Sequence, residues 1–327
     1  MDILPSAVDA LVVGGGPAGL SAASWLGRHR RRTLVVDAGQ PRNRFADEVH
    51  GVLGHEGIDP AELLARGRRE LDTYPHVDVC AGTVVGLTST AAGFDVEIEG
   101  SGTVTASRLV LATGVRDELP DIEGFLDHYG SSVFHCPSCD GYAARDHTVA
   151  VLGWGEHVPA FAVGLLDWAA TVRVVTGAED PDITPEQRRR LAERGIEVVD
   201  GEVAALEGQD GQLSAVRLAD GSEVHATMAF FSIAHHPVVG LAVGLGCDLA
   251  PDGRLSVDGQ RRTTVEGVYA AGDVTPGAQL VSVAAAEGTL AGVACATSLH
   301  GRRTAAEVPA PAPDPEALAP EHVPDAG

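Results

Sequence analysis

The sequence predicts an α/β protein made of two Rossmann-like nucleotide-binding units, each of the three-layer ββα kind. Near the N-terminus a short apolar strand runs into a glycine-rich turn and then a helix, and the same pattern restarts at Val149. The chain has 327 residues, 44% of them hydrophobic, which is enough for two domains with cores of their own.

The first unit opens with an apolar strand at 10–13 and a helix that we expect to end near Arg30. A second strand at 33–36 delivers Asp37. The turn between strand and helix has the spacing Gly-x-Gly-x-x-Gly and consists of Gly14, Gly16, Pro17, Ala18 and Gly19, with Gly15 inside the first interval.

These glycines permit a tight turn, a close backbone approach to a pyrophosphate and close packing of helix on strand. The helix N-terminus favours the phosphate charge, and Asp37 stands at the distance from the turn that suits a ribose hydroxyl. We therefore predict that the first unit binds a dinucleotide.

The elements that follow the first unit predict one helix and a small sheet. Residues 60–71 have helical spacing, and short strands at 78–85, 94–99 and 103–111 suggest a meander. A turn of Ala112, Thr113 and Gly114 ends this block.

The second unit repeats the strand–turn–helix pattern. We expect a strand at 149–152, a glycine turn with Gly153 and Gly155 that is a possible NAD(P) loop, a helix at 157–169 and a strand at 171–176. The next helix should begin at Thr184, with Gln187 completing a capping box.

The C-terminal part of the chain returns to glycine-lined structure. Further strands are expected through about Ser232, and a later strand delivers Gly272 and Asp273. A last helix should cover 281–300. Residues 306–327 are rich in Pro, Ala, Glu and Asp without periodicity, so we predict a disordered tail there.

Composition excludes several function classes. The formal net charge of -23 would repel phosphate backbones and anionic lipid, so neither nucleic acid nor membrane is an expected partner. All 23 basic residues are arginine, which rules out a Schiff-base lysine and a P-loop lysine. The first apolar stretch carries Asp2 and Asp9 in place of a basic leader, so we expect a soluble, cytoplasmic protein.

Cys136 and Cys139 form a CxxC pair that stands apart from the three scattered cysteines. If Cys136 opens a helix, both thiols face the same way within disulfide reach. The helix N-terminus and the neighbouring His135 would then lower a thiolate pKa, as thiol exchange requires.

Two other interpretations of the CxxC remain open. A zinc site needs about four ligands, and without a second CxxC it would depend on His135 and His147. A buried, inert pair is possible but leaves the spacing without a reason. We favour a redox-active dithiol and expect no metal.

The ordered set of motifs resembles the low-molecular-weight thioredoxin reductases, a family of FAD-dependent pyridine nucleotide-disulfide oxidoreductases. The first glycine turn, the Ala-Thr-Gly turn, the CxxC-Asp-Gly before the second unit and the terminal Ala-Gly-Asp all occur in order, and the resemblance covers about residues 9–302. It implies a discontinuous FAD domain of 1–116 and 246–305, with an inserted NAD(P)-binding-like domain at 117–245. It also implies a homodimer.

The resemblance also implies the roles of single residues. Cys139 would be the thiol nearest the flavin, Cys136 the thiol that exchanges with substrate, and Asp140 the proton donor or acceptor. The implied FAD contacts are Gly14, Gly16, Pro17, Ala18, Gly19, Asp37, Ala112, Thr113, Gly114, Gly272 and Asp273.

The sequence departs from the family where NADPH would bind. The family's His-Arg-Arg is replaced by Thr176-Gly-Ala-Glu-Asp180, whose Glu179 and Asp180 would repel a 2′-phosphate. Val158 stands where a small residue normally allows close packing. Val281 and Ser282 stand where many members have Arg-Gln. FAD is thus the expected cofactor, and NAD(P)H use is uncertain.

Three functions follow from these features. The favoured one is a dithiol oxidase that forms a disulfide in a small-molecule natural product or another dithiol, with O2 as acceptor. The alternative is an NAD(P)H-dependent reductase of a thioredoxin-like protein, and the third is a non-enzymatic redox sensor. His50 and His55 lie in a glycine-rich loop and are expected to be ordinary loop residues rather than proton shuttles.

Overall fold

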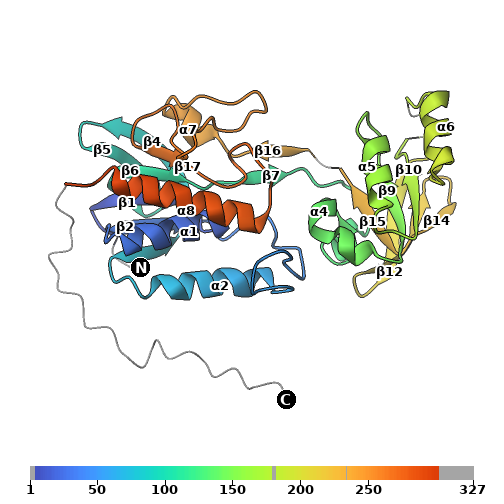
Figure 1. The fold of residues 1–327 in the computed structure, drawn as a ribbon, viewed down its shortest axis with the longest axis horizontal. Coiled ribbons are helices and arrows are strands. Elements are labelled where there is room, and N and C mark those ends of the chain that lie inside the picture. The colour runs from blue at the N-terminus through green and yellow to red at the C-terminus, as the bar shows by residue number, and fades with distance from the viewer. Residues whose placement is uncertain (1–3, 179–181, 233, 302–327) are drawn as a thin grey trace, which may run out of the picture.

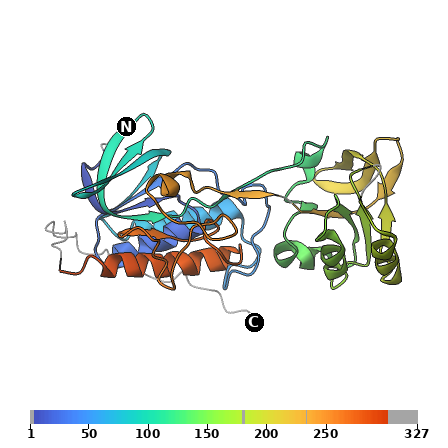
Figure 2. The same ribbon diagram turned by 90° about the horizontal axis from the view of Figure 1, so that it is seen from above.

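The computed structural model describes residues 4–178, 182–232 and 234–301. These residues form two lobes joined by two extended segments, as Figures 1 and 2 show. The connecting strands, β7 (Val115–Asp117) and β16 (His235–Pro237), pair antiparallel. The predicted tail, 306–327, lies outside the described residues.

The first lobe contains a mixed sheet in the order β3-β2-β1-β6-β5-β4, with β17 also paired to β6. Pairs among β1, β2, β3, β6 and β17 are parallel, whereas β5 is antiparallel to both β4 and β6. The strands are β1 (Ala7–Val13), β2 (Thr33–Asp37), β3 (Val77–Ala81), β4 (Val84–Thr90), β5 (Gly93–Ile98), β6 (Gly102–Leu111) and β17 (Val268–Ala270).

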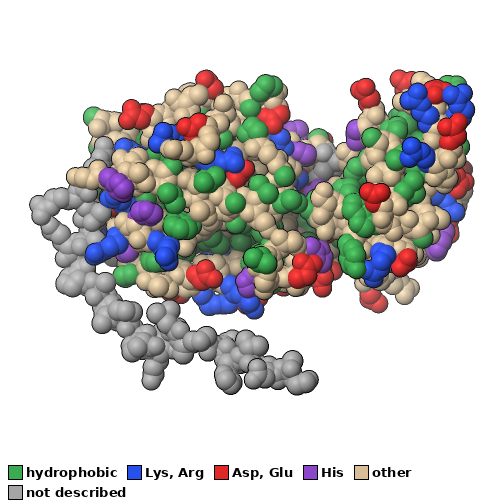
Figure 3. Space-filling model, in the orientation of Figure 1, with side chains coloured by type: hydrophobic (Ala, Val, Ile, Leu, Met, Phe, Trp, Pro, Cys, Tyr) green, Lys and Arg blue, Asp and Glu red, His purple; other side chains and the backbone are tan. Residues whose placement is uncertain are grey.

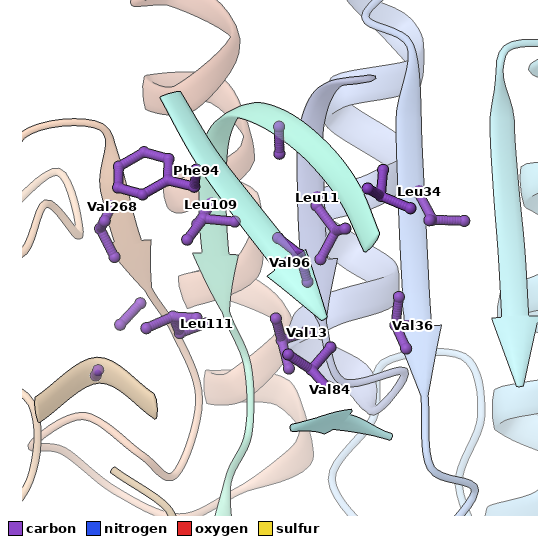
Figure 4. Close-up of a cluster of buried hydrophobic side chains, with 14 of the residues drawn as sticks. Leu11, Val13, Leu34, Val36, Val84, Phe94, Val96, Leu109, Leu111 and Val268 are labelled. Atoms are coloured by element: carbon purple, nitrogen blue, oxygen red, sulfur yellow. The ribbon is translucent and has the colours of Figure 1, made fainter. Parts of the chain in front are cut away.

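The lobe has three layers because the strands alternate their side chains between two cores. Leu11 and Val13 point toward the β4–β5 meander, where Phe94 and Val96 complete the cluster in Figure 4. Alternate residues of β1 point toward the helices. Figure 2 shows α8 (red) and the teal meander on opposite sides of the sheet. The helices are α1 (Pro17–Arg28), α2 (Pro60–Leu71), α7 (Gly240–Gly244) and α8 (Val281–Thr297).

The second lobe repeats this layering. Its parallel sheet has the order β11-β10-β9-β15-β8, and an antiparallel sheet β12-β13-β14 packs beside it. The strands are β8 (Val133–Phe134), β9 (Thr148–Leu152), β10 (Thr171–Val175), β11 (Glu197–Val199), β12 (Val203–Gln209), β13 (Gln212–Leu218), β14 (Glu223–His225) and β15 (Met228–Phe231). The helices are α3 (Phe125–His128), α4 (Pro137–Asp140), the 3₁₀ helix η1 (Gly141–Ala144), α5 (Val158–Leu165) and α6 (Pro185–Glu193).

The predicted fold class and several elements are confirmed. α2 covers the predicted 60–71, and Thr184 and Gln187 form the predicted capping box at the start of α6. One strand prediction is wrong: residues 78–85 are not one strand of a meander. β3 ends at Ala81 and pairs parallel with β2, and β4 begins a new layer at Val84. The helices predicted for 157–169 and 281–300 are shorter, at 158–165 and 281–297.

The proposed domain boundaries, at 117 and 246, stay a prediction. The side chains of Val239, Leu241, Ala242 and Leu245 already pack on the core of the first lobe. Among the described residues, no helix has both the length and the hydropathy to cross a bilayer.

α1 and α8 pack with their backbones in close approach. A Cβ added at Gly288 would lie 2.0 Å from the carbonyl oxygen of Ala18, and one at Gly292 would lie 2.5 Å from that of Ala22. Ser21 and Thr289 share a hydrogen bond of 2.9 Å across the same contact. Since these contacts are to backbone atoms, no side chain can rotate away to admit a larger residue.

Gly288→Ala should therefore destabilise the protein by about 2 kcal/mol, as overpacking against a fixed backbone does. Gly164→Ala in α5 is the matched control, because a Cβ there meets nothing within 4 Å. It should be neutral or stabilise the fold by up to about 1 kcal/mol. Urea unfolding of both variants measures the difference, and equal stability would show that α1 and α8 can separate freely.

Candidate dithiol and flavin site

The first glycine turn lies where β1 ends and α1 begins. Gly14 has φ +107°, and a Cβ there would lie 2.3 Å from the carbonyl oxygen of Ala112. A Cβ at Gly19 would lie 1.8 Å from the carbonyl oxygen of Gly14. Glycine is therefore required at both positions, and α1 can begin directly above the strand end.

The N-terminus of α1 is suited to an anion. Gly16 is its N-cap residue and supplies no side-chain hydrogen bond, and Pro17 occupies the first turn. A Cβ at Gly16 would meet nothing within 4 Å, so this backbone faces open space. Uncapped amides at a helix N-terminus beside open space are a fitting cradle for the pyrophosphate of a dinucleotide.

Asp37 lies beside this turn, at the end of β2. A Cβ added at Gly15 would lie 2.5 Å from the Asp37 carboxyl carbon, which shows how closely the turn and the carboxylate approach. Asp37 accepts hydrogen bonds from Arg68 and from the amide of Gly39. Its side chain is 15% exposed.

A buried glutamate holds the Gly272–Asp273 turn. Glu287 on α8 is 4% exposed and accepts hydrogen bonds from the Gly272 amide and the Thr275 hydroxyl, each at 2.9 Å. Arg261 neutralises the carboxylate at 2.7 Å. This network fixes Asp273 at the edge of the sheet, since β17 ends directly before the turn.

Sequence reasoning missed two residues of this site, Arg42 and Gln279. Arg42 forms two hydrogen bonds of 2.8 Å with Asp117 and one of 2.9 Å with Asp273. It also donates to Gln279 Oε1 at 2.8 Å. Gln279 Nε2 is buried without a hydrogen-bond partner, so this donor suits an acceptor on a bound cofactor.

No motif in the sequence marks either residue, because Arg42 and Gln279 are 237 positions apart and meet only in the folded chain. Gln279 is also a polar residue two positions before Val281, where the sequence was expected to depart from the family's Arg-Gln. Ser282 itself donates to the Gly51 carbonyl at 2.7 Å.

Cys136 and Cys139 form a disulfide with their Cα atoms 5.3 Å apart. Cys136 is the N-cap of α4, and its Sγ accepts a hydrogen bond from the Cys139 amide at 3.2 Å. Both cysteines are half-buried. Figure 1 shows α4 on the side of the second lobe that faces the first. Within the described ranges, no group of three His, Cys, Asp or Glu side chains is arranged to hold a metal ion.

Charges around the dithiol differ from the expectation at one residue. Burial, together with the nearby Arg42 guanidinium, lowers the pKa of His135 to about 4. With the disulfide formed, His135 is therefore neutral at ordinary pH, and the positive charge expected beside the cysteines is absent from this state. Its Nδ1 and the Tyr129 hydroxyl share a hydrogen bond of 3.0 Å.

Burial raises the pKa of Asp140 to about 6, against a smaller opposing effect of His50. A carboxyl with this pKa can both give and take a proton near neutral pH. Because Asp140 directly follows Cys139 in α4, the arrangement pairs a half-buried disulfide with an acid–base group.

A loop of the first lobe contacts the second lobe beside α4. Phe45 and Tyr129 have ring centroids 5.4 Å apart, and Ser131 donates to Asp47 at 2.7 Å. In Figure 3, histidine side chains lie on both sides of the junction between the lobes. The redox pair is thus held close to the first lobe.

The second glycine turn is present in altered form. Gly153 has φ +95°, as such a turn requires, but α5 begins only at Val158. His147 shares a hydrogen bond with Thr227. Glu179 and Asp180 lie outside the described residues.

The two Rossmann-like units, the dinucleotide turn and the Cys136–Cys139 disulfide define the class of protein as an FAD-dependent thiol–disulfide oxidoreductase. Residues 8–288 match the family model described as pyridine nucleotide-disulphide oxidoreductase. The chain belongs to this family and is an FAD-dependent oxidoreductase acting on sulfur groups. The family predicted from the motifs is confirmed.

Known proteins resemble the chain over nearly their whole length. It is 33% identical to "Thioredoxin reductase tcpT" of Claviceps purpurea, covering 89% of this chain and 94% of the relative. The crystal structure of HlmI has a TM-score of 0.85 and 34% identity, covering 90% and 93% of the two chains. The oxidoreductase from Agrobacterium tumefaciens has a TM-score of 0.80 and 36% identity, covering 89% and 98%.

Asp37→Ala should weaken FAD binding about ten- to hundredfold, since a hydrogen bond to a charged group contributes roughly 1.5–3 kcal/mol. Asp78→Ala, on the exposed face of β3, is the matched control and should bind FAD normally. Flavin fluorescence during titration of the apoprotein measures both affinities. Equal affinities would remove Asp37 from the cofactor site.

Proposed function

We propose that this flavoprotein is a dithiol oxidase, in which a substrate dithiol reduces the Cys136–Cys139 disulfide and O2 takes the electrons from FAD. The substrate would be a small-molecule dithiol, with a thioredoxin-like protein as the alternative. A homodimer and a cytoplasmic location stay predictions.

The observation that carries this proposal is the residue at the end of β10. The Gly14 amide donates to the Val36 carbonyl, and the Gly153 amide donates to the Val175 carbonyl, each at 2.8 Å. Asp37 follows Val36 and Thr176 follows Val175, so Asp37 and Thr176 occupy equivalent positions in the two units. Thr176 is 2% exposed, and its hydroxyl donates to the Ala178 carbonyl. At this position the second unit therefore has a threonine hydroxyl, already donating to backbone, where the first unit has a carboxylate to bind a ribose hydroxyl, which argues against NAD(H) as the electron donor.

The residues around the dithiol support both halves of the exchange. A substrate thiolate attacks Sγ of Cys136, the S–S bond breaks, and Cys139 leaves as a thiolate. The second substrate thiol then attacks the mixed disulfide, which releases the cyclic product and Cys136. Asp140 accepts a proton from a reacting thiol. The FAD that the first turn and Asp37 would hold would supply two-electron redox chemistry between the reduced Cys136–Cys139 pair and O2, so that overall one dithiol and O2 give one disulfide and H2O2.

A nicotinamide-driven disulfide reductase is the second candidate. The glycine turn at Gly153 and Gly155 favours it, as do relatives whose names read thioredoxin reductase. In that case electrons would flow from the flavin to the disulfide and then to a disulfide substrate.

Anaerobic mixing with NADH, NADPH and a small dithiol separates the two functions. We expect the dithiol alone to bleach the flavin absorbance near about 450 nm, with recovery when air is admitted. Fast bleaching by a nicotinamide would instead establish the reductase. Bleaching without repeated turnover would identify a redox sensor.

Cys139→Ser should keep FAD but lose dithiol-driven bleaching, and Cys80→Ser, at a half-exposed free cysteine in β3, is the control that should retain it. Loss of FAD from the Cys139 variant would count against its assigned role.

The rate of bleaching by dithiol should rise with pH through about 6, because Asp140, with its pKa raised to about 6, accepts a proton only when ionised. A second rise near about pH 8.5 reflects thiol ionisation. Asp140→Asn should remove the lower inflection and keep the upper one. A stopped-flow pH series on both proteins measures this, and an unchanged lower inflection in the variant would exclude Asp140 as the base.

A further inference from the structure

The two glycine turns of this chain can be compared position by position, because both begin with the same amide-to-carbonyl hydrogen bond. Gly153 matches Gly14, as shown above. Counting onward, Trp154 matches Gly15, and His157 and Val158 match Ala18 and Gly19. The first turn thus shows what room a dinucleotide turn needs.

Val158 stands where no Cβ fits in the first turn. At Gly19 that atom would lie 1.8 Å from the carbonyl of Gly14. Val158 is 2% exposed, and its three side-chain carbons could not be placed at the position that Gly19 has in the first turn. The second helix also begins later. α1 begins at Pro17, whereas α5 begins at Val158, which matches Gly19 and so lies two positions further along. The Val158 amide is used by the Gly155 carbonyl at 3.0 Å, so it cannot face a phosphate.

The backbone of the second turn also has a side chain beside it. A Cβ at Gly16 would meet nothing within 4 Å, but one at Gly155 would lie 3.1 Å from the imidazole of His157. The middle glycine of a dinucleotide turn is needed for close approach of the backbone to the pyrophosphate. In this turn the exposed imidazole of His157 lies beside that backbone.

Trp154 ties together two segments that border the ends of β9 and β10. The equivalent Gly15 has room for hydrogen only, since a Cβ would lie 2.5 Å from the Asp37 carboxyl carbon. The half-buried indole of Trp154 packs against the core of the second lobe. Its Nε1 donates to the Asp182 carbonyl at 3.1 Å, so it bridges the turn after β9 and the segment between β10 and α6. Dinucleotides bind in the crevice at these strand ends.

We propose that Trp154, His157 and Val158 close the second crevice to nicotinamide dinucleotides and so determine that the flavin exchanges electrons with thiols and not with a pyridine nucleotide. The residues present do not fit the nucleotide that the family's description names. The effect on electron transfer rests on the proposed function. Closure of the crevice to nucleotides does not, because nucleotide binding can be measured without turnover.

The test transplants the residues of the first turn into the second as the variant W154G/H157A/V158G. Calorimetric titration with NAD+ and NADP+, which cannot reduce a flavin, measures binding apart from chemistry. The FAD-loaded wild type should show no saturation up to millimolar nucleotide, and the variant should bind at least tenfold more tightly. V163G is the control, because it removes a valine from α5 at a position away from the turn. Its affinity for NAD+ and NADP+ should equal that of the wild type.

Two results would overturn the inference. One is saturation of the wild type at micromolar nucleotide. The other is no gain in a variant that keeps FAD and is still bleached by dithiol, since both signals show that it is folded. Neither result decides the oxidase proposal, which fails separately if NADH or NADPH bleaches the wild-type flavin. W154G alone, with a smaller expected gain, serves if the triple variant does not fold.

Discussion

Close contact between backbones at α1 is the constraint on which the flavin lobe depends. The helix lies against the end of β1 on one side and against α8 on the other, and both contacts exclude a Cβ at Gly19 and Gly288. These contacts bring residues from the two ends of the chain to one edge of the sheet. Glu287, one position before Gly288 on α8, then holds the turn that carries Asp273.

Arg42 connects this edge with the dithiol lobe. Its guanidinium bonds Asp117 on the connecting strand β7 as well as Asp273, so one side chain links this edge of the sheet to the strands that join the lobes. The same charge helps to keep His135 neutral. With the imidazole uncharged, the ionisable group beside the cysteines is Asp140, whose burial keeps its pKa near the range in which thiol exchange needs a proton acceptor.

The chain contains its own comparison between a nucleotide turn that is open and one that is filled. Both units share the strand–turn–helix order and the hydrogen bond that starts the turn. They differ at the matched positions: Gly15 and Gly19 let the first turn pack closely on Asp37 and on the strand end, whereas Trp154 and Val158 in the second turn require a different path, and its helix begins later. The second unit can keep its fold without binding a nucleotide, because the hydrophobic cores beneath the two turns consist of protein side chains alone.

Sequence reasoning succeeded where the signal is local. The bounds of α2, the capping box at Thr184 and the disulfide reach of Cys136 and Cys139 follow from spacing within a few residues. It was wrong about residues 78–85, because alternation predicts a strand but does not say which neighbour it pairs with.

The sequence by itself determined the two Rossmann-like units, the CxxC pair within disulfide reach and the family. Only the tertiary structure decided the charge of His135, the donor set of Arg42 and Gln279, and the filling of the second crevice. The physical reason is that these properties depend on burial and on contacts between residues far apart in the chain, and neither is encoded in local spacing.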